Sequence, residues 1–172
     1  MEQPNELLRY ADIEDKCYGI AGMTIAMFIF NAESYLAGIS IDRSDLESLE
    51  FNPEFQFFRT QEISAKSVWN YILKRFNLTS GLLISNLLCR YYFHHRRNIP
   101  AEASKELLRR LAEEGKSSCE LEAEEVENVF NKNMSYLNQA FRSPNVEYVV
   151  RTLVARLQSD HHLAIDEIIE LM

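Results

Sequence analysis

Basic, aromatic and histidine side chains alternate in one short stretch, residues 90–97, which reads Arg-Tyr-Tyr-Phe-His-His-Arg-Arg. On a helix, Asn86, Arg90, His94 and Arg97 would fall on one face, because residues three or four apart are neighbours. Such a stripe is suited to a phosphate or a carboxylate, since the planar guanidinium forms two parallel hydrogen bonds with these groups. The sequence therefore offers one candidate anion-binding site.

A purely structural role for residues 90–97 is better supported than an anion-binding site. Tyr91 and Tyr92 continue the apolar face of the preceding residues, and arginines near a helix C-terminus interact favourably with the helix dipole. Acidic partners are available within the chain, such as the turn at 120–125. We therefore expect the arginines mainly to form ion pairs within the protein. Basic and aromatic residues also interleave in proteins that bind single-stranded nucleic acid.

The four histidines form two dipeptides, His94-His95 and His161-His162. Adjacent helical residues point about 100° apart, so at most one histidine of each pair is expected to face a shared metal ion. His162 and Asp166 would share a helix face and supply two ligands, and no third ligand is identifiable. We predict no metal site and no cofactor, and we expect the histidines to be exposed at helix ends.

Signatures of familiar catalytic sites are missing from the rest of the sequence. The chain has neither the Gly-rich loops that cradle phosphates nor the G-x-S-x-G elbow of hydrolases. No glutamate lies three residues before a histidine, so the Glu-x-x-His pairs of di-iron bundles are missing too. Cys17, Cys89 and Cys119 lie far apart in apolar patterns, which favours buried, reduced thiols in a cytoplasmic protein. No catalytic residue is predicted.

Charge is distributed unevenly along the 172 residues, whose net charge is −8. Residues 60–99 hold 6 basic residues and 1 acidic residue, whereas the segments before and after them are acidic. An acidic protein of this kind is not expected to bind nucleic acid or an anionic membrane surface. The most apolar run, residues 20–30, is shorter than the roughly 20 residues that span a bilayer.

The elements that would position these residues are helices, because apolar side chains recur every three to four positions almost throughout. A straight helix over the first pattern, residues 5–36, would be longer than the expected diameter of the domain. We therefore expect a bend or a close helix crossing at Gly19 and Gly22. Gly38 is the expected stop. Further helices are expected over 60–76, 83–92, 100–115, from a Ser117-x-x-Glu120 capping box to 141, from Pro144 to 157, and over 165–171, with a turn at 77–81.

Residues 39–59 are the least regular part of the pattern. Ser44-x-x-Glu47 has the form of a capping box and predicts a short helix. Four aromatic residues, Phe51, Phe55, Phe57 and Phe58, are too many for a free loop, so we expect this connection to pack across the bundle or onto a partner chain.

These patterns predict an all-α fold, an irregular bundle of six or seven mostly antiparallel helices in a single domain over residues 1–172. The leading functional hypothesis is a non-enzymatic interaction or oligomerisation module, whose partner is another protein or a second copy. The alternative is a regulatory protein that binds a small ligand or an anion at residues 90–97. An enzyme of unknown type would require a polar pocket with shifted pKa values.

Overall fold

The computed structural model describes residues 4–53 and 65–172, and most of this part of the chain is helical. Its α-helices are α1 (Pro4–Leu8), α2 (Ile13–Ile29), α4 (Ala65–Cys89), α5 (Ala101–Cys119), α6 (Ala123–Phe141), α7 (Pro144–Asp160) and α8 (Ile165–Leu171). The predicted all-α class is confirmed, with seven α-helices in the described residues. None of these helices has both the length and the apolar character needed to cross a membrane.

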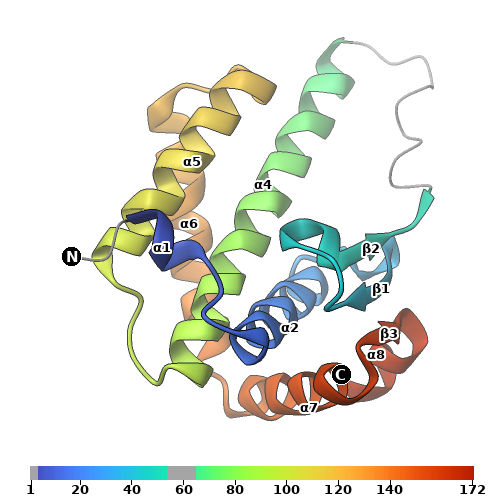
Figure 1. The fold of residues 1–172 in the computed structure, drawn as a ribbon. Coiled ribbons are helices and arrows are strands. Elements are labelled where there is room, and N and C mark those ends of the chain that lie inside the picture. Colours follow the sequence, from blue (N-terminus) through green and yellow to red (C-terminus); the bar gives the residue numbers. More distant parts are fainter. Residues whose placement is uncertain (1–3, 54–64) are drawn as a thin grey trace.

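Three helices, α4, α5 and α6, pack together as one group, in which α5 runs antiparallel to the other two (Figure 1). Helix α2 crosses the C-terminal half of α4, and α7 packs on α2 in turn. The N-terminal half of α4 and the C-terminal half of α5 extend beyond α2 (Figure 1). The buried side chains at this end of the group belong to the same hydrophobic core as those of α2.

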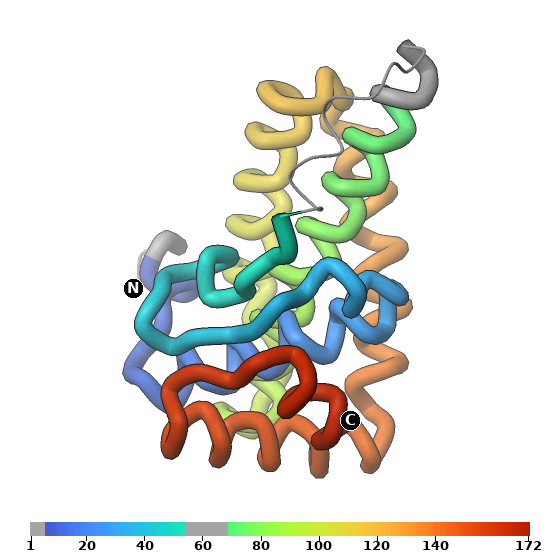
Figure 2. The backbone as a smooth tube through the Cα atoms, turned by 90° about the vertical axis from the view of Figure 1, so that its right-hand side faces the viewer, coloured from blue at the N-terminus to red at the C-terminus, as the bar shows by residue number. Residues whose placement is uncertain are grey.

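A small antiparallel sheet, which the helical pattern does not predict, lies beside α2 on the side away from α5 (Figures 1 and 2). Its strands are β1 (Leu36–Ser40), β2 (Leu49–Phe51) and β3 (His162–Ala164), in the order β2-β1-β3. Ile39 pairs with Leu49 on one side and with Leu163 on the other. The sheet therefore joins the C-terminal segment to the N-terminal third of the chain.

Helix α2 is the centre of the core, since residues 17–27 are buried at every position. It is shorter than the predicted pattern over 5–36, because Asp12 caps its first turn by accepting a hydrogen bond from the Asp15 backbone N–H at 2.8 Å. The predicted close crossing at Gly19 and Gly22 is confirmed: a Cβ atom on Gly22 would lie 2.3 Å from the Ser85 carbonyl oxygen. The helix stop expected at Gly38 is wrong, because Gly38 lies within β1.

Helix α4 is continuous through residues 77–81, where the sequence predicts a turn. Tertiary contacts outweigh the weak helix preference of this stretch. Gly81 makes room for the Phe30 ring, whose Cε2 atom would lie 2.4 Å from an added Cβ. On the other side, the Asn77 side-chain oxygen accepts a hydrogen bond from Asn133 of α6 at 3.1 Å. Residues 60–64 of the helix predicted over 60–76 lie outside the described residues.

Helices α5 and α6 also differ from their predicted bounds. Helix α5 continues past Gly115, whose lack of a side chain leaves room for Val126 and Phe76, and ends where Glu120 adopts a left-handed conformation with φ 52°. The capping box of α6 is formed by Glu122 and Glu125, so the predicted box at Ser117–Glu120 is wrong. Near Ser44, the short helix predicted for the connection is a 3-10 turn over Asp45–Ser48.

Glu106, which is buried on α5, supplies a pH-dependent contribution to stability. Its carboxylate accepts hydrogen bonds from Arg109 and Arg110, both at 2.9 Å, and these bonds lower its pKa to about 2. A carboxyl group whose pKa is depressed on folding stabilises the protein above its unfolded pKa, and this contribution is lost as the pH falls towards the folded pKa.

We expect Glu106→Gln to lower the free energy of unfolding at neutral pH by about 1 kcal/mol. The difference from the parent protein should shrink between about pH 5 and about pH 2, as measured by urea unfolding at several pH values. The control is Glu127→Gln, at an exposed position of α6, which should show no such trend. A pH-independent loss for Glu106→Gln would contradict this account.

Candidate functional site

The predicted anion stripe lies at the C-terminal end of α4, where the helix passes into a π-helical turn over Arg90–His94. The Arg90 side chain is 3% exposed and forms a two-point ion pair with Asp15 of α2, which is fully buried. Its Nε donates to one Asp15 oxygen at 2.9 Å and its Nη2 to the other at 2.7 Å. The guanidinium also donates to the carbonyl oxygens of Leu8 and Arg9. Arg90 therefore fastens the connection between α1 and α2 to the end of α4.

Asp15 has further donors around it. The Ala11 backbone N–H donates to its carboxylate at 2.9 Å, and the His95 Nε2 lies 3.1 Å from it. Burial acts to raise the pKa of Asp15, but the hydrogen bonds from Arg90 and Ala11 outweigh burial and hold this pKa below its usual range. Asp15 is therefore an ionised, saturated acceptor that balances the buried arginine.

The other members of the stripe also have internal contacts. The Asn86 side chain donates to the Tyr10 hydroxyl at 2.8 Å, and the His94 ring stacks on Tyr18 with centroids 5.0 Å apart. Arg97 is exposed, and its guanidinium lies 5.2 Å from the centre of the Tyr91 ring. An anion at Arg90 would have to displace Asp15.

The acidic partners of this region are not the expected ones. Arg90 pairs with Asp15, and Arg96 pairs with Glu147 of α7 at 3.0 Å, whereas the sequence points to the turn at 120–125. The sequence does mark Asp15, because this carboxylate lies just before the most apolar part of the first pattern. A charge that is buried there needs a partner. Its partner lies 75 residues away, which no local pattern reveals.

The two histidine pairs have different surroundings. At the end of the π turn, the His94 and His95 rings lie with centroids 4.7 Å apart. Both rings therefore face the same region, contrary to the expectation for adjacent helical residues. Burial lowers the pKa of His95, and the charges of nearby cations add to this effect. By contrast, His162 lies in β3 and contacts Glu50 at 3.0 Å. It does not share a helix face with Asp166 of α8, so the predicted ligand pair is wrong.

The three cysteines are free and buried, as expected. Burial raises the pKa of each thiol, that of Cys17 to about 11. A thiol that stays protonated at neutral pH is a poor nucleophile, so these groups serve the core.

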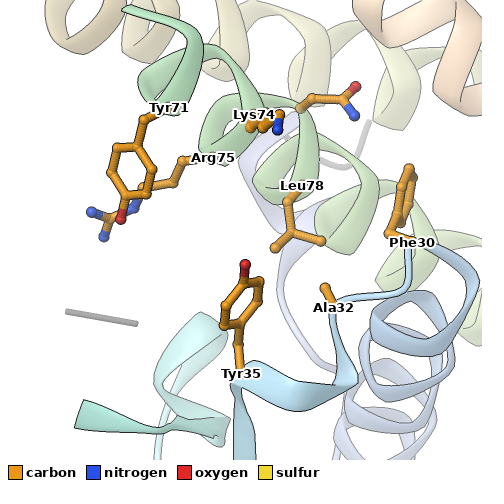
Figure 3. A pocket seen from close by; sticks show the side chains of 8 residues that line it. Phe30, Ala32, Tyr35, Tyr71, Lys74, Arg75 and Leu78 are labelled. Carbon is orange, nitrogen blue, oxygen red and sulfur yellow. The ribbon is translucent and has the colours of Figure 1, made fainter. Parts of the chain in front are cut away.

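A hollow of about 350 Å³ opens beside α4, where its N-terminal half extends beyond α2 (Figure 3). Ala32 and Tyr35 border it from the segment after α2, and Leu78 projects from α4 towards Tyr35 (Figure 3). Phe30 closes one side of the hollow. Its ring packs edge-on against the ring of Tyr136 of α6, with the ring centroids 6.3 Å apart. The volume lies at the lower end of the range for ligand pockets.

A second, wider hollow of about 790 Å³ adjoins the first and shares Arg75 and Leu78 with it. Its opposite wall comes from β2 and the 3-10 turn before it, and includes Glu50 and Phe51. We call the two hollows together the α4 groove. Of the four predicted interface residues, Phe51 lies in this groove, and Phe55, Phe57 and Phe58 lie outside the described residues.

Lysine 74 provides the charge at the rim of the first hollow. Lys74 is exposed, and within residues 4–53 and 65–172 no ion pair to it is formed. Arg75, the next residue along α4, borders both hollows. The signal in the sequence is the basic segment 60–99, although nothing in it shows which residues border a hollow.

The chain matches no protein-family model, no curated protein sequence and no solved structure.

Proposed function

We propose that the protein is a non-enzymatic binding module whose α4 groove receives an acidic peptide segment of another protein, anchored by an apolar side chain. The observation that carries this proposal is the continuity of two hollows, of which the first is lined mainly by apolar groups and has Lys74 at its rim. The stripe at residues 90–97 is the weaker candidate, because Asn86 and Arg90 are held by Tyr10 and Asp15.

The length of the groove favours a peptide. It follows α4 from Tyr71 to Leu82, a distance of about 17 Å at 1.5 Å per helical residue. About five residues of an extended peptide cover this distance at roughly 3.3 Å each. A small molecule of ordinary size would fill one hollow and leave the other.

The apolar floor of the first hollow gives a peptide its anchor. Phe30, Ala32 and Leu78 line the hollow, whose volume of about 350 Å³ suits one aromatic or large aliphatic side chain. The aromatic residues Tyr35 and Tyr136, 36% and 52% exposed, lie next to it. Binding energy at protein interfaces is concentrated where such anchors enter pockets bordered by aromatic residues.

Charge at the first hollow favours an acidic partner, whereas the second hollow is lined by residues of both signs. Helix α4 contains no Asp or Glu, and its charged residues are Lys66, Lys74 and Arg75. A peptide that lies along α4 therefore meets positive charge at the first hollow. Complementary charges of this kind set orientation and select partners more than they add affinity.

The test is fluorescence anisotropy with ten-residue peptides that all contain one Phe and one Leu, flanked in one set by Asp and Glu and in the other by Lys. We expect the parent protein to bind the acidic set preferentially. Lys74→Glu should weaken that binding about tenfold, equivalent to about 1.4 kcal/mol, because the substitution reverses the charge at the rim. Lys105→Glu, on an exposed position of α5, makes the same change away from the groove and should bind as the parent does.

Four results would overturn the proposal. Equal binding of acidic and basic peptides would contradict the argument from charge. Equal losses of peptide affinity in Lys74→Glu and Lys105→Glu would show that the peptide does not bind in the α4 groove. Saturable binding of benzoate or octanoate without any peptide binding would assign the groove to a small carboxylate. Self-association that is lost in Lys74→Glu, measured by sedimentation, would assign the groove to a second copy of the chain.

A further inference from the structure

We infer that Asp15, His94 and His95 form a binding site for a divalent transition-metal ion of the zinc, cobalt and nickel class. One potential ligand atom from each of these residues lies within 4.8 Å of the others. The site is separate from the α4 groove, and it assigns to the end of α4 a role that no sequence motif indicates.

The two adjacent histidines lie where the π turn ends: His94 is its last residue and His95 is its C-cap. In an α-helix neighbouring side chains diverge by about 100°, which would keep His94 and His95 apart. A π turn holds more residues, so successive side chains diverge less, and such turns are frequent at functional sites. The two rings here lie with centroids 4.7 Å apart at an interplanar angle of 55°.

The distances fit a metal ion after a small adjustment. Zinc binds nitrogen and oxygen ligands at about 2.0–2.2 Å, which places tetrahedral ligands about 3.4 Å apart. The Asp15 Oδ1 and His95 Nε2 atoms are already 3.1 Å apart, and the widest separation in the group, at most 4.8 Å, has to close by about 1.4 Å. Because His94 and His95 are partly exposed, rotation of the imidazoles can make this adjustment, and an ion can enter from solvent.

Supporting contacts hold each ligand in position, as is usual around metal sites. Arg90 and the Ala11 backbone N–H fix the Asp15 carboxylate. The Tyr18 ring stacks on His94, and the Tyr91 ring lies 5.3 Å from His95. A bound ion would replace the contact between His95 and Asp15 with bonds to both residues.

The ligand set defines the class of ion. Two imidazoles and one carboxylate suit zinc, cobalt and nickel, whereas magnesium and calcium require oxygen ligands. Arg90 already balances the charge of Asp15, so the imidazoles must supply most of the binding energy. Substitution of either histidine is therefore the sharpest test.

The experiment is titration of the purified full chain with Co²⁺, followed by visible absorption, and with Zn²⁺, followed by calorimetry and melting temperature. We expect one ion per chain and a rise in melting temperature, because an ion that binds only the folded state stabilises it. His94→Phe keeps a ring on Tyr18, and His95→Gln keeps a donor to Asp15. Each variant should lose at least about tenfold in affinity, the loss produced even by changes in supporting residues.

The second histidine pair supplies the matched control. The double variant His161→Ala, His162→Ala removes two imidazoles near the carboxylates of Asp42 and Glu50 and should bind the ion as the parent does. Thiolate charge-transfer bands in the cobalt spectrum would instead assign binding to cysteine. That result would overturn the inference, as would an affinity that is unchanged in either His94→Phe or His95→Gln, lost in the control, or unmeasurable in the parent protein.

Discussion

Replacing Arg90 with methionine is expected to lower the free energy of unfolding by about 3–5 kcal/mol, because it leaves the buried carboxylate of Asp15 without its cation. It also removes the donors to the Leu8 and Arg9 carbonyl oxygens, which hold α1 against the end of α4. Since small domains are stable by only about 5–15 kcal/mol, we expect the variant to retain a small fraction of the parent stability.

Urea unfolding followed by circular dichroism measures this loss, and Arg96→Met is its matched control. Arg96 lies six residues along the chain and pairs with Glu147 at 3.0 Å, but the two side chains are 58% and 37% exposed. Exposed ion pairs contribute about 0–1 kcal/mol, so the same chemical change should have a small effect there. Equal losses of unfolding free energy in Arg90→Met and Arg96→Met would show that the buried pair of Arg90 and Asp15 stabilises the fold no more than the exposed pair does.

A double variant separates the effect of charge from that of packing. Asp15→Leu combined with Arg90→Met leaves no uncompensated charge, and buried ion pairs can often be replaced by apolar residues at little cost. We expect the double variant to recover part of the stability lost in Arg90→Met. Recovery should be incomplete, because the Leu8 and Arg9 carbonyl oxygens still lack their donor. A double variant less stable than Arg90→Met would contradict this explanation.

The helical class of the fold is predictable from the sequence because helix periodicity is a local signal. The start of α7 at Pro144 and the close crossing at Gly19 and Gly22 follow from residue types at single positions. Proline suits the first turn of a helix, and glycine permits close backbone approach. These features need no knowledge of distant contacts.

The sheet and the continuity of α4 depend on contacts that the sequence does not display. Strand β3 has three residues and pairs with β1, more than a hundred residues earlier, so no hairpin signal marks it. Residues 77–81 resemble a turn, and they are helical because Phe30 covers Gly81 and Asn133 bonds Asn77. In both cases tertiary packing outweighs local preference.

The site shows the same division between local and distant information. Asn86, Arg90 and His94 are singled out by spacing, but their partners Tyr10, Asp15 and Tyr18 come from the first twenty residues. The direction in which Arg90 points therefore depends on where α2 crosses α4. The α4 groove is formed by segments distant in sequence as well, so its residues carry no common motif.

Replacing Gly22 with alanine is expected to lower the free energy of unfolding by about 2 kcal/mol. In an isolated helix, replacing glycine with alanine stabilises the helix by about 1 kcal/mol. The close contact at the crossing must therefore cost more than this gain. An added Cβ would lie 2.3 Å from the Ser85 carbonyl oxygen and 2.6 Å from the Cys89 Cβ. Because the nearest atom belongs to the backbone of α4, the helices must separate, and overpacking of this kind costs about 1–3 kcal/mol or more.

Gly115→Ala is the matched control, because Gly115 also lies inside a helix and is buried. An added Cβ there would first meet a methyl carbon of Val126 at 2.7 Å, and a side chain can shift where a backbone cannot. The helix preference of alanine offsets the remaining strain, so we expect a change within about 1 kcal/mol of zero. Urea unfolding of both variants decides the matter: if Gly22→Ala is no less stable than Gly115→Ala, α2 and α4 are not in the tight backbone contact on which the positions of Asp15 and Arg90 depend.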